Sequence, residues 1–403
     1  MPFAVECQAR YGDMFTMRIE GAPWVMLADP EAIREVFSAR PELVHAGEAN
    51  EILRPTLGPR SILLLDEADH LRQRKLMLPP FHGERMQRYR DAMVEVTERE
   101  LQRMPVGRAF AMRPHMQAIT LEVIMRAIFG ARSGELRRLR ELLARMLDRV
   151  ARPRRLLMLA LLGPNSAPMR RLARRELAPL DAELHRVIAQ RRAAPDIEDR
   201  DDILSMLLLA RDENGLGLSD GELRDELVTL LLAGHETTAT SLAWAFERLT
   251  RHPEMLDRLV ADDDYRDAVV KETLRLRPVI ALVMRTLTAP LDVGGRRLPA
   301  GAKVVPCILL VHRREDLYPE PHAFRPERFL NGGGPGAYGW VPFGGGVRRC
   351  LGAAFAQMEM SVVLQTVAAR VRLDPVGPPE RVRRRAITFV PARGGEVRVI
   401  AAR

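Results

Sequence analysis

Apolar residues recur along most of this chain at the spacing of amphipathic helices. The clearest pattern starts at Ser219, which forms a capping box with Glu222, and it continues through apolar positions to Leu249. Pro253 cannot donate the backbone hydrogen bond of a continuing helix, so the pattern predicts one helix of about thirty residues. Further helices are predicted over residues 30–39, 84–104, 115–129, 134–150, 168–192, 264–276 and 351–370.

Strand patterns are short and lie mostly near the two ends of the chain. They comprise the segments "FTMRI", "WVMLA", "KVVPCI", "ITFVPA" and "VRVIAA", each bounded by turn-forming residues. Internal repeats and linker-like segments are not evident in the sequence. We therefore expect a mainly α protein with a small β portion, organised as a single domain over residues 1–403.

Composition indicates a globular protein with a large core. The 403 residues are 47% hydrophobic and 29% charged. The three cysteines lie far apart without a CxxC pair, which argues against a disulfide framework or a zinc site and favours a reducing compartment. The sequence shows neither a long apolar run nor a signal-peptide pattern, so we expect a cytoplasmic protein without a stable membrane anchor.

The formal charge of +9 raises nucleic acid as a possible partner. However, 62 basic residues are interspersed with 53 acidic ones, and no basic stripe alternates with aromatic residues. This distribution is typical of a solvated surface, so we do not expect nucleic acid to bind.

The middle of the long predicted helix, "LLLAGHETTATSLAW", contains weak helix formers. Gly234 and the pair Thr237 and Thr238 lie where helix propensity matters most. One interpretation is a glycine that lets two helices pack closely. The other is a local opening in the helix, beside Glu236 and Thr237, that could hold water. The stretch taken alone favours the packing interpretation.

A possible ion pair follows in "KETLRLRP". Glu272 and Arg275 are three residues apart and so share one helix face. Arg328, in "FRPERF", is a candidate to join them. The same spacing recurs at several other places, where an exposed surface pair is the default, so spacing alone does not single out this pair.

The stretch "FGGGVRRCLG" places Cys350 directly before a predicted helix. Its glycines resemble a phosphate-binding loop, but the Gly-Lys-Ser/Thr that such a loop requires does not follow. The helix dipole and the neighbouring Arg348 and Arg349 would stabilise a thiolate at Cys350. The thiolate could be a nucleophile or the ligand of an iron held mainly by a macrocycle, and a buried, unreactive cysteine is the third possibility.

The same stretch resembles the haem-ligand signature of cytochromes P450, F-x-x-G-x-R-x-C-x-G, at every fixed position. These positions are Phe343, Gly346, Arg348, Cys350 and Gly352. The segments "AGHETT", "ETLR" and "PERF" resemble further P450 segments and follow in the family's order. The resemblance covers essentially the whole chain and is strongest to the soluble bacterial members.

This resemblance implies the cytochrome P450 fold, with the long helix crossing over the haem. It implies haem b (iron protoporphyrin IX) as cofactor, with Cys350 as the axial ligand of the iron. Other residues expected to contact the haem are His70, Arg74, Ala233, Arg285, Phe343, Gly344, Arg348 and Gly352. Among them, His70, Arg74, Arg285 and Arg348 would bind the propionates.

The resemblance also assigns catalytic and structural roles. Glu236 and Thr237 would deliver protons, with a kink at Gly234 making room, and Glu272, Arg275 and Arg328 would form a buried network. The implied reaction inserts one oxygen atom of O2 into an apolar substrate, such as a terpenoid, a fatty acid or a polyketide. The distal pocket would be lined by Ile62, Ala233, Ile280 and Leu282, with residues 156–163 near an access lid.

Electrons would come from a separate ferredoxin or flavodoxin with its NAD(P)H reductase. This donor would dock on a basic face near Arg72, Lys75 and Arg349, and we expect the enzyme to be a monomer. A haem-thiolate peroxygenase or isomerase would not need the intact "HETT", and a haem sensor would usually carry an output module. Monooxygenation is therefore the preferred prediction.

Overall fold

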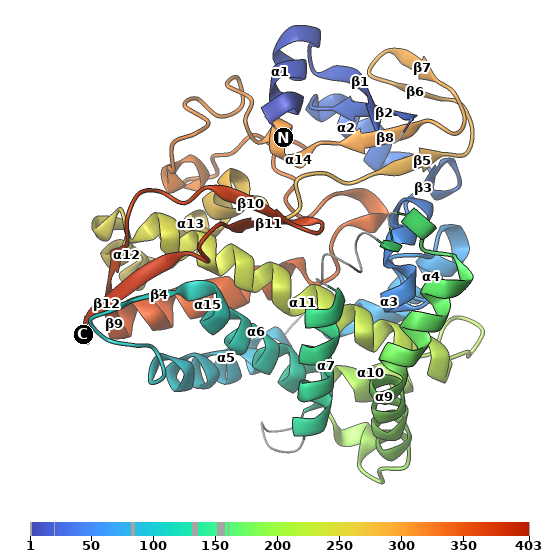
Figure 1. Ribbon diagram of the computed structural model, residues 1–403, viewed down its shortest axis with the longest axis horizontal. Coiled ribbons are helices and arrows are strands. Elements are labelled where there is room, and N and C mark those ends of the chain that lie inside the picture. Colours follow the sequence, from blue (N-terminus) through green and yellow to red (C-terminus); the bar gives the residue numbers. More distant parts are fainter. Residues whose placement is uncertain are drawn as a thin grey trace. The chain divides into compact units, whose positions relative to one another are not determined.

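The computed structural model describes residues 2–19, 21–81, 85–130, 136–150, 158–159 and 161–402. The chain divides into two compact units. The first comprises Met1–His45, Arg90–Thr120 and Glu236–Arg403, and the second comprises Ala46–Tyr89 and Leu121–His235. The long helix α11 (Asp220–Leu249), yellow-green in Figure 1, contributes to both units. The expectation of a single domain stays a prediction.

The helices account for most of the regular structure. Those of the first unit are α1 (Pro2–Tyr11), α2 (Pro30–Ser38), α12 (Pro253–Ala261), α13 (Asp263–Leu276), α14 (Ile308–Val311) and α15 (Ala353–Arg370). Those of the second are α3 (Arg54–Leu57), α4 (Glu67–Met77), α7 (Arg137–Val150), α9 (Ala167–Arg192) and α10 (Ile203–Leu209). Like α11, α5 (Arg85–Leu101) and α6 (Met112–Phe129) run from one unit into the other.

The long helices predicted from apolar spacing are confirmed to within three residues at each end. The predicted starts at 84 and 134 fall on residues outside the described ranges. The short helices α1, α3, α10, α12 and α14 were not predicted.

The described strands all belong to the first unit. A five-stranded sheet has the order β1 (Met14–Ile19), β2 (Ala22–Leu27), β8 (Lys303–Pro306), β5 (Arg285–Leu287) and β3 (Val44–His45). A three-stranded sheet joins β4 (Ala109–Ala111), β12 (Glu396–Ala402) and β9 (Val371–Pro375). Two hairpins pair β6 (Leu291–Val293) with β7 (Arg296–Leu298) and β10 (Val382–Arg385) with β11 (Thr388–Pro391). The mainly α fold with a small β portion is confirmed.

Helix α2 packs its apolar face into one core of the first unit. Asp29 caps the helix by accepting a hydrogen bond of 2.8 Å from the backbone N–H of Ala32, and Pro30 occupies the first helical position. Ile33, Val36 and Phe37 are buried in a cluster with residues of the five-stranded sheet. This packing fixes the end of α2 that carries Phe37.

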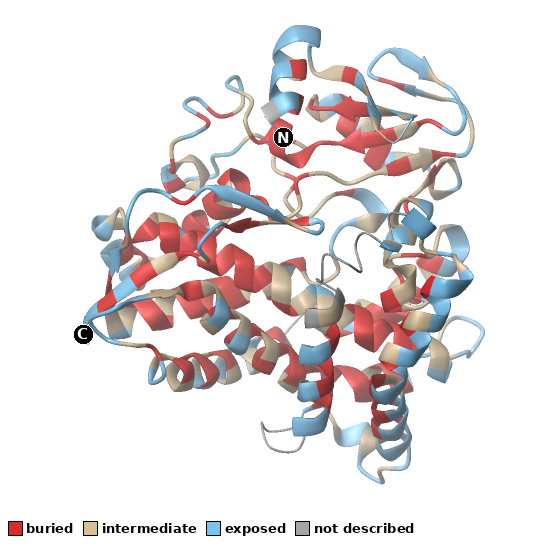
Figure 2. Cartoon of the chain, viewed as in Figure 1, coloured by how far each residue is buried: buried red, intermediate tan, exposed pale blue. Residues whose placement is uncertain are grey.

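The start of α11 has the predicted capping box. The backbone N–H of Ser219 donates to Glu222 Oε2 at 2.8 Å, and the N–H of Glu222 donates to Ser219 Oγ at 3.3 Å. Much of the helix is buried, as its red colour in Figure 2 shows.

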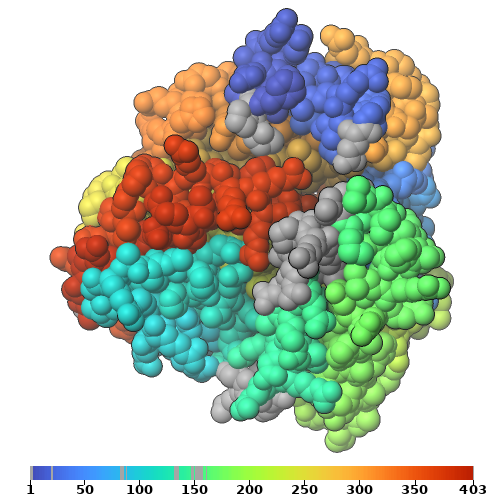
Figure 3. All heavy atoms as spheres, in the orientation of Figure 1, coloured from blue at the N-terminus to red at the C-terminus, as the bar shows by residue number. Residues whose placement is uncertain are grey.

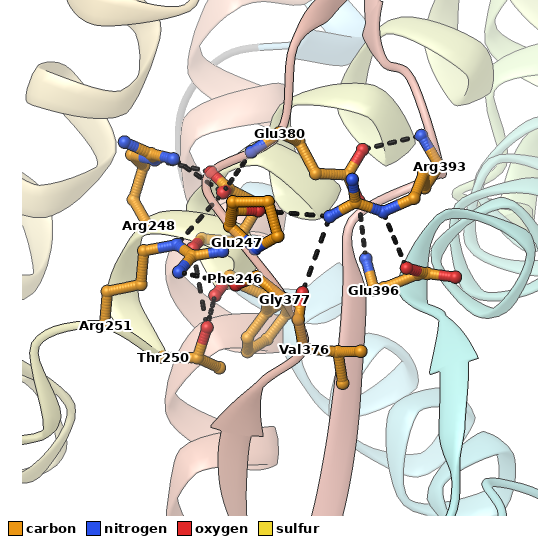
Figure 4. A network of polar contacts seen from close by, with 11 residues as sticks. Phe246, Glu247, Arg248, Thr250, Arg251, Val376, Gly377, Glu380, Arg393 and Glu396 are labelled. Atoms are coloured by element: carbon orange, nitrogen blue, oxygen red, sulfur yellow. Dashed lines mark hydrogen bonds and ion pairs between the residues drawn. The ribbon is translucent and has the colours of Figure 1, made fainter.

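The C-terminal end of α11 is tied to the end of the chain by carboxylates that accept backbone N–H groups (Figure 4). Glu247, which also bonds to Arg248, accepts the N–H of Glu380 at 2.9 Å. Glu380 in turn accepts the N–H groups of Arg393 at 2.7 Å and Glu396 at 2.8 Å. The residues just before β12 therefore hold the last turn of the long helix.

The predicted pair of Glu272 and Arg275 is present on α13, and both side chains are 0% exposed. Two hydrogen bonds of 2.6 and 2.8 Å join them. Arg275 also donates to the backbone carbonyl oxygens of His312, Pro321 and Ala323 at 2.9, 2.8 and 3.0 Å. Arg328 Nε lies 3.5 Å from Glu272 Oε1, which confirms the third member of the network.

Removing one partner of this pair should destabilise the protein strongly. Glu272→Ala would leave Arg275 buried without its carboxylate, so we expect a loss of about 3–5 kcal/mol in the free energy of unfolding. The matched control is Glu31→Ala, because Glu31 and Arg34 have the same spacing but 62% and 48% exposed side chains. Urea unfolding of both variants measures the two losses in the free energy of unfolding. Comparable losses for Glu272→Ala and Glu31→Ala would contradict the structural role of Glu272.

Candidate haem-thiolate site

The glycines before Cys350 allow the loop Phe343–Gly352 to pack against the end of α2. Gly344 and Gly346 have positive φ angles of 66° and 64°, which favour glycine. A Cβ atom on Gly345 would lie 2.3 Å from the Phe37 ring, and one on Gly346 would lie 1.9 Å from the Phe37 carbonyl oxygen. The glycine run therefore serves close backbone packing.

His312 connects this loop to the buried ion pair. Its Nε2 accepts the backbone N–H of Val341 at 2.9 Å, and its carbonyl oxygen accepts a hydrogen bond from Arg275. Burial, together with the charge of Arg275, lowers the pKa of His312 to about 3. The imidazole is therefore neutral and keeps a lone pair for Val341, two residues before Phe343. No local sequence pattern indicates this contact, because the two residues are 29 positions apart.

Cys350 differs from the other two cysteines in its exposure. Cys7 and Cys307 are buried, whereas Cys350 is exposed. Burial raises the pKa of the Cys307 thiol to about 11, which makes it unreactive. The N–H of Cys350 donates to the carbonyl oxygen of Phe343 at 2.9 Å, and α15 begins three residues later. The accessible thiol thus lies near the positive end of a helix dipole.

The middle of α11 presents an accessible face within an otherwise largely buried helix. Ala233 is exposed, and Glu236 and Thr237 are partly exposed, whereas the residues from Thr238 to Phe246 are buried. Positions three and four apart lie on the same side of a helix. These three predicted site residues therefore share one face of α11.

Glu236 accepts hydrogen bonds from three side chains of the first unit. Gln117 Nε2 donates to Glu236 Oε2 at 2.5 Å, and Arg385 Nη1 donates to Oε1 at 3.1 Å. Arg113 forms a further ion pair with Oε1. Glu236 is 19% exposed, so this ion network is only slightly open to solvent. None of the three partners was predicted, because they come from α6 and β10, far away in the sequence.

Gly234 serves close packing between α11 and α6. A Cβ atom at this position would lie 3.1 Å from Ile124 Cγ1, which is tighter than an ordinary contact. The helix is continuous from Asp220 to Leu249. The structure therefore favours the packing interpretation of the glycine, and the kink expected at Gly234 does not interrupt the helix.

Two of the four predicted propionate anchors are close to the cysteine loop in the first unit. Arg285, at the start of β5, is buried, and its guanidinium lies 5.6 Å from the centre of the Phe37 ring. The loop contacts the same phenylalanine through Gly345 and Gly346. Arg348 belongs to this loop and is partly exposed.

The other two predicted anchors lie on α4 in the second unit. His70 is 2% exposed, and Arg74, one turn later, is partly exposed. Their spacing of four residues places both on one face of the helix.

Arg72 does not contribute to an open basic surface, in contrast to our expectation for the donor face. Its guanidinium donates to Asp212 at 2.6 Å, to Glu222 at 3.2 Å and to the carbonyl oxygen of Gly217 at 2.9 Å. Lys75 lies 3.8 Å from Glu213, and both are largely exposed. Arg72 therefore holds the start of α11 to α4, and its charge is neutralised locally.

A comparison with known protein families identifies the family to which this chain belongs. A family model described as cytochrome P450 matches residues 2–394. The chain belongs to the cytochrome P450 family. A Mycobacterium tuberculosis protein described as cytochrome P450 135B1 is 45% identical over the full chain and 87% of its own length. Another, described as cytochrome P450 137, is 40% identical over 98% of this chain and 84% of its own length.

Solved P450 structures have the same fold. A cyanobacterial P450 with bound retinoic acid matches with a TM-score of 0.84 and 26% identity, over 100% of this chain and 94% of the other. The haem domain of cytochrome P450DA matches with a TM-score of 0.84 and 24% identity, over 98% and 91% of the two chains.

Membership in this family makes the protein a haem-dependent monooxygenase, an oxidoreductase whose cofactor is haem b held by a cysteine thiolate. The side chains described above fit that cofactor. They provide an accessible thiol, an accessible helix face at Ala233, and a buried guanidinium at Arg285 for an anionic group. Among the described helices, none combines the length and apolarity needed to cross a bilayer.

Cysteine labelling should distinguish the accessible thiol from the buried ones. In haem-free protein, iodoacetamide should modify Cys350 roughly tenfold faster or more than Cys307, because reactivity follows exposure and thiolate content. Bound haem should protect Cys350. Peptide mass spectrometry over a time course measures each site, and comparable rates at Cys307 and Cys350 would contradict the assigned environments.

Proposed function

We propose that this P450 inserts one oxygen atom of O2 into an apolar organic substrate, with Cys350 as the axial ligand of the haem iron. The observation that carries the proposal is the exposed thiol of Cys350 at the fixed position of the P450 signature, on a loop anchored by glycine packing and by His312. When bound, haem b supplies the oxygen-activating chemistry, tuned by electron donation from the thiolate.

The residues around the thiol would control the environment of the sulfur. Phe343 makes an edge-on contact with Trp340, at 6.1 Å between ring centres, and this contact restrains its ring. Phe343, Gly344 and Gly352 would shield the sulfur from water and offer it backbone amides. His70, Arg74, Arg285 and Arg348 would hold the two propionates by charge-assisted hydrogen bonds, and Ala233 would lie against the haem.

Glu236 and Thr237 would deliver the protons that oxygen activation consumes. Three side chains, Gln117, Arg113 and Arg385, already donate to the Glu236 carboxylate, and they would hold it in place and compete with a further donor for its oxygens. The Thr237 hydroxyl, on the same helix face, would position the transferred proton.

The substrate is proposed to be apolar, such as a terpenoid, a fatty acid or a polyketide. The predicted distal residues Ile62, Ile280 and Leu282 are apolar, and Ile62 is buried while the other two are partly exposed. The predicted lid, residues 156–163, lies partly outside the described residues. The cyanobacterial relative solved with retinoic acid supports an apolar, chain-like compound.

Electrons are proposed to come from a separate ferredoxin or flavodoxin with its NAD(P)H reductase. The exposed residues Val347 and Arg349, next to Cys350, offer a mixed apolar and basic surface for such a donor. A cytoplasmic location is part of the proposal, and the free cysteines favour it.

The ligand assignment is tested by the spectrum of the ferrous-CO complex. We expect Cys350→Ser to abolish the long-wavelength Soret band, because the serine hydroxyl cannot replace the thiolate as electron donor. Cys7→Ser and Cys307→Ser serve as controls and should retain the band. Survival of the band in Cys350→Ser would refute the assignment.

The proton-delivery role is tested by the coupling of electron use to product. Thr237→Ala should still bind haem and substrate but should lose most of its product per NAD(P)H consumed, with peroxide formed instead. Thr238→Ala is the neighbouring control, since Thr238 is buried and should affect coupling less. Unchanged coupling in Thr237→Ala would assign this residue to helix packing. Product formed with peroxide alone, and not with O2 and a donor, would indicate a peroxygenase.

A further inference from the structure

A cavity of about 580 Å³ lies within the second unit, apart from every residue assigned above to haem binding. Three segments line this cavity, which is open to solvent. They are Arg54–Arg60, at α3 and the turn after it, the first part of α9 with the residues preceding it, and the first turns of α11. The volume is in the range of cavities that bind organic molecules of moderate size.

The part of α9 that lines this cavity is one continuous helix face. Lining residues recur three or four positions apart, at Arg170, Ala173, Arg174, Leu177, Asp181 and His185. Helix α9 has a buried side and an exposed side, which are red and pale blue in Figure 2, and its outer surface is green in Figure 3. Ala173 and Leu177 are 5% exposed, so the cavity has an apolar floor, which Pro55 and Pro59 extend.

Two of the five arginines that line the cavity are neutralised by carboxylates. Arg54 binds Glu51 through two hydrogen bonds. Arg224 is 9% exposed and bonds to Asp181 at 2.5 and 2.8 Å and to Asp225 at 2.8 Å. These two arginines are therefore structural, and they fix the floor and one side of the cavity.

The other three arginines, Arg60, Arg170 and Arg174, form no ion pair among the residues that the structure describes, although Arg60 has a coulombic interaction with Asp225. Arg170 donates to the carbonyl oxygen of Asn165, which leaves its charge uncompensated. All three are exposed. Five arginines against the carboxylates of Glu51, Asp181 and Asp225 leave an excess of two positive charges around an apolar floor.

The wall formed by the segment Gly58–Ile62 is held rigidly against α11. The N–H of Arg60 donates to Asp225 at 2.9 Å, Ser61 Oγ lies 2.8 Å from Thr229 Oγ1, and the N–H of Ile62 donates to Glu226 at 2.6 Å. Gly58 allows the close approach, since a Cβ there would lie 2.1 Å from the Asp225 carboxylate. A wall fixed before binding lowers the entropy cost of holding a ligand.

We propose that this cavity binds an amphipathic organic anion, with its acidic head group at Arg60, Arg170 and Arg174 and its apolar part over Ala173 and Leu177. Guanidinium groups bind carboxylate and phosphate through paired hydrogen bonds, whereas an apolar floor adds affinity only for a ligand with a hydrocarbon portion. This second site is independent of Cys350 and does not rest on the proposed function.

The test is calorimetric titration of the full-length holoenzyme with four probes. Dodecanoate and dodecyl phosphate should bind, dodecanol should bind much more weakly, and inorganic phosphate alone should bind weakly for lack of an apolar part. The two dodecyl anions show whether carboxylate or phosphate is the preferred head group. Affinity for the preferred probe should fall as salt is raised from low to physiological concentration, because exposed charges are screened.

The decisive variant is Arg170→Gln with Arg174→Gln, and its matched control is Arg171→Gln with Arg175→Gln. The control residues are exposed neighbours on α9 that do not line the cavity, so both variants change the net charge equally. The first should weaken binding of the dodecyl anion by about tenfold or more, as expected for loss of charge-assisted hydrogen bonds, and the control should change it less than twofold.

Three results would overturn the proposal. They are no saturable binding of either dodecyl anion by the wild type, equal loss of affinity in both variants, or binding that shifts the Soret band and is unaffected by Arg170→Gln with Arg174→Gln. The last would place the anion at the haem. The ferrous-CO spectrum of each variant reports separately on Cys350 as haem ligand. A failure of the anion-site proposal can therefore be told apart from a failure of the haem-thiolate proposal.

Discussion

The cysteine loop depends on a buried ion pair that it does not itself contain. Glu272 and Arg275 are fully buried. The N–H groups of Arg275 that do not bind Glu272 donate to the backbone carbonyl oxygens of His312, Pro321 and Ala323, which precede the loop in the sequence. His312 carries the connection further, because its uncharged ring accepts the N–H of Val341. A buried guanidinium needs partners for its N–H groups, and Arg275 has them in Glu272 and three backbone carbonyl oxygens. The benefit of this network is a fixed backbone just before Phe343.

Much of the fold followed from periodicity, because long helices repeat the same spacing many times. The β5, β6 and β7 strands escaped prediction, since three residues give too little alternation to detect. The three-residue spacing also could not show which of the Glu-x-x-Arg pairs is buried. Glu31 with Arg34 and Glu272 with Arg275 are alike in sequence and opposite in exposure. Burial is a property of tertiary packing, which a three-residue motif does not encode.

The site was predictable only where its residues form a local sequence motif. Cys350 could be singled out because its motif is local and specific, and Glu236 and Thr237 because they lie in one helical stretch. The partners of Glu236 come from α6 and β10, and only the folded chain places Arg113, Gln117 and Arg385 beside it. For Arg72 the sequence predicts an exposed positive charge on the docking face, and the structure differs. Asp212, 140 positions later in the chain, neutralises that charge.

The attachment of α11 to the chain's last residues has a consequence for the order of folding. Glu247 at the end of α11 is bound to Glu380, which also binds the backbone at Arg393 and Glu396, and β12 pairs with β4 near residue 110. During synthesis, none of these contacts can form until the segment that carries Glu380, Arg393 and Glu396 has left the ribosome. Long-range contacts of this kind slow folding and leave apolar helices exposed meanwhile. Glu247 is synthesised 133 positions before its partner Glu380, and a nascent chain would need protection from aggregation in that interval.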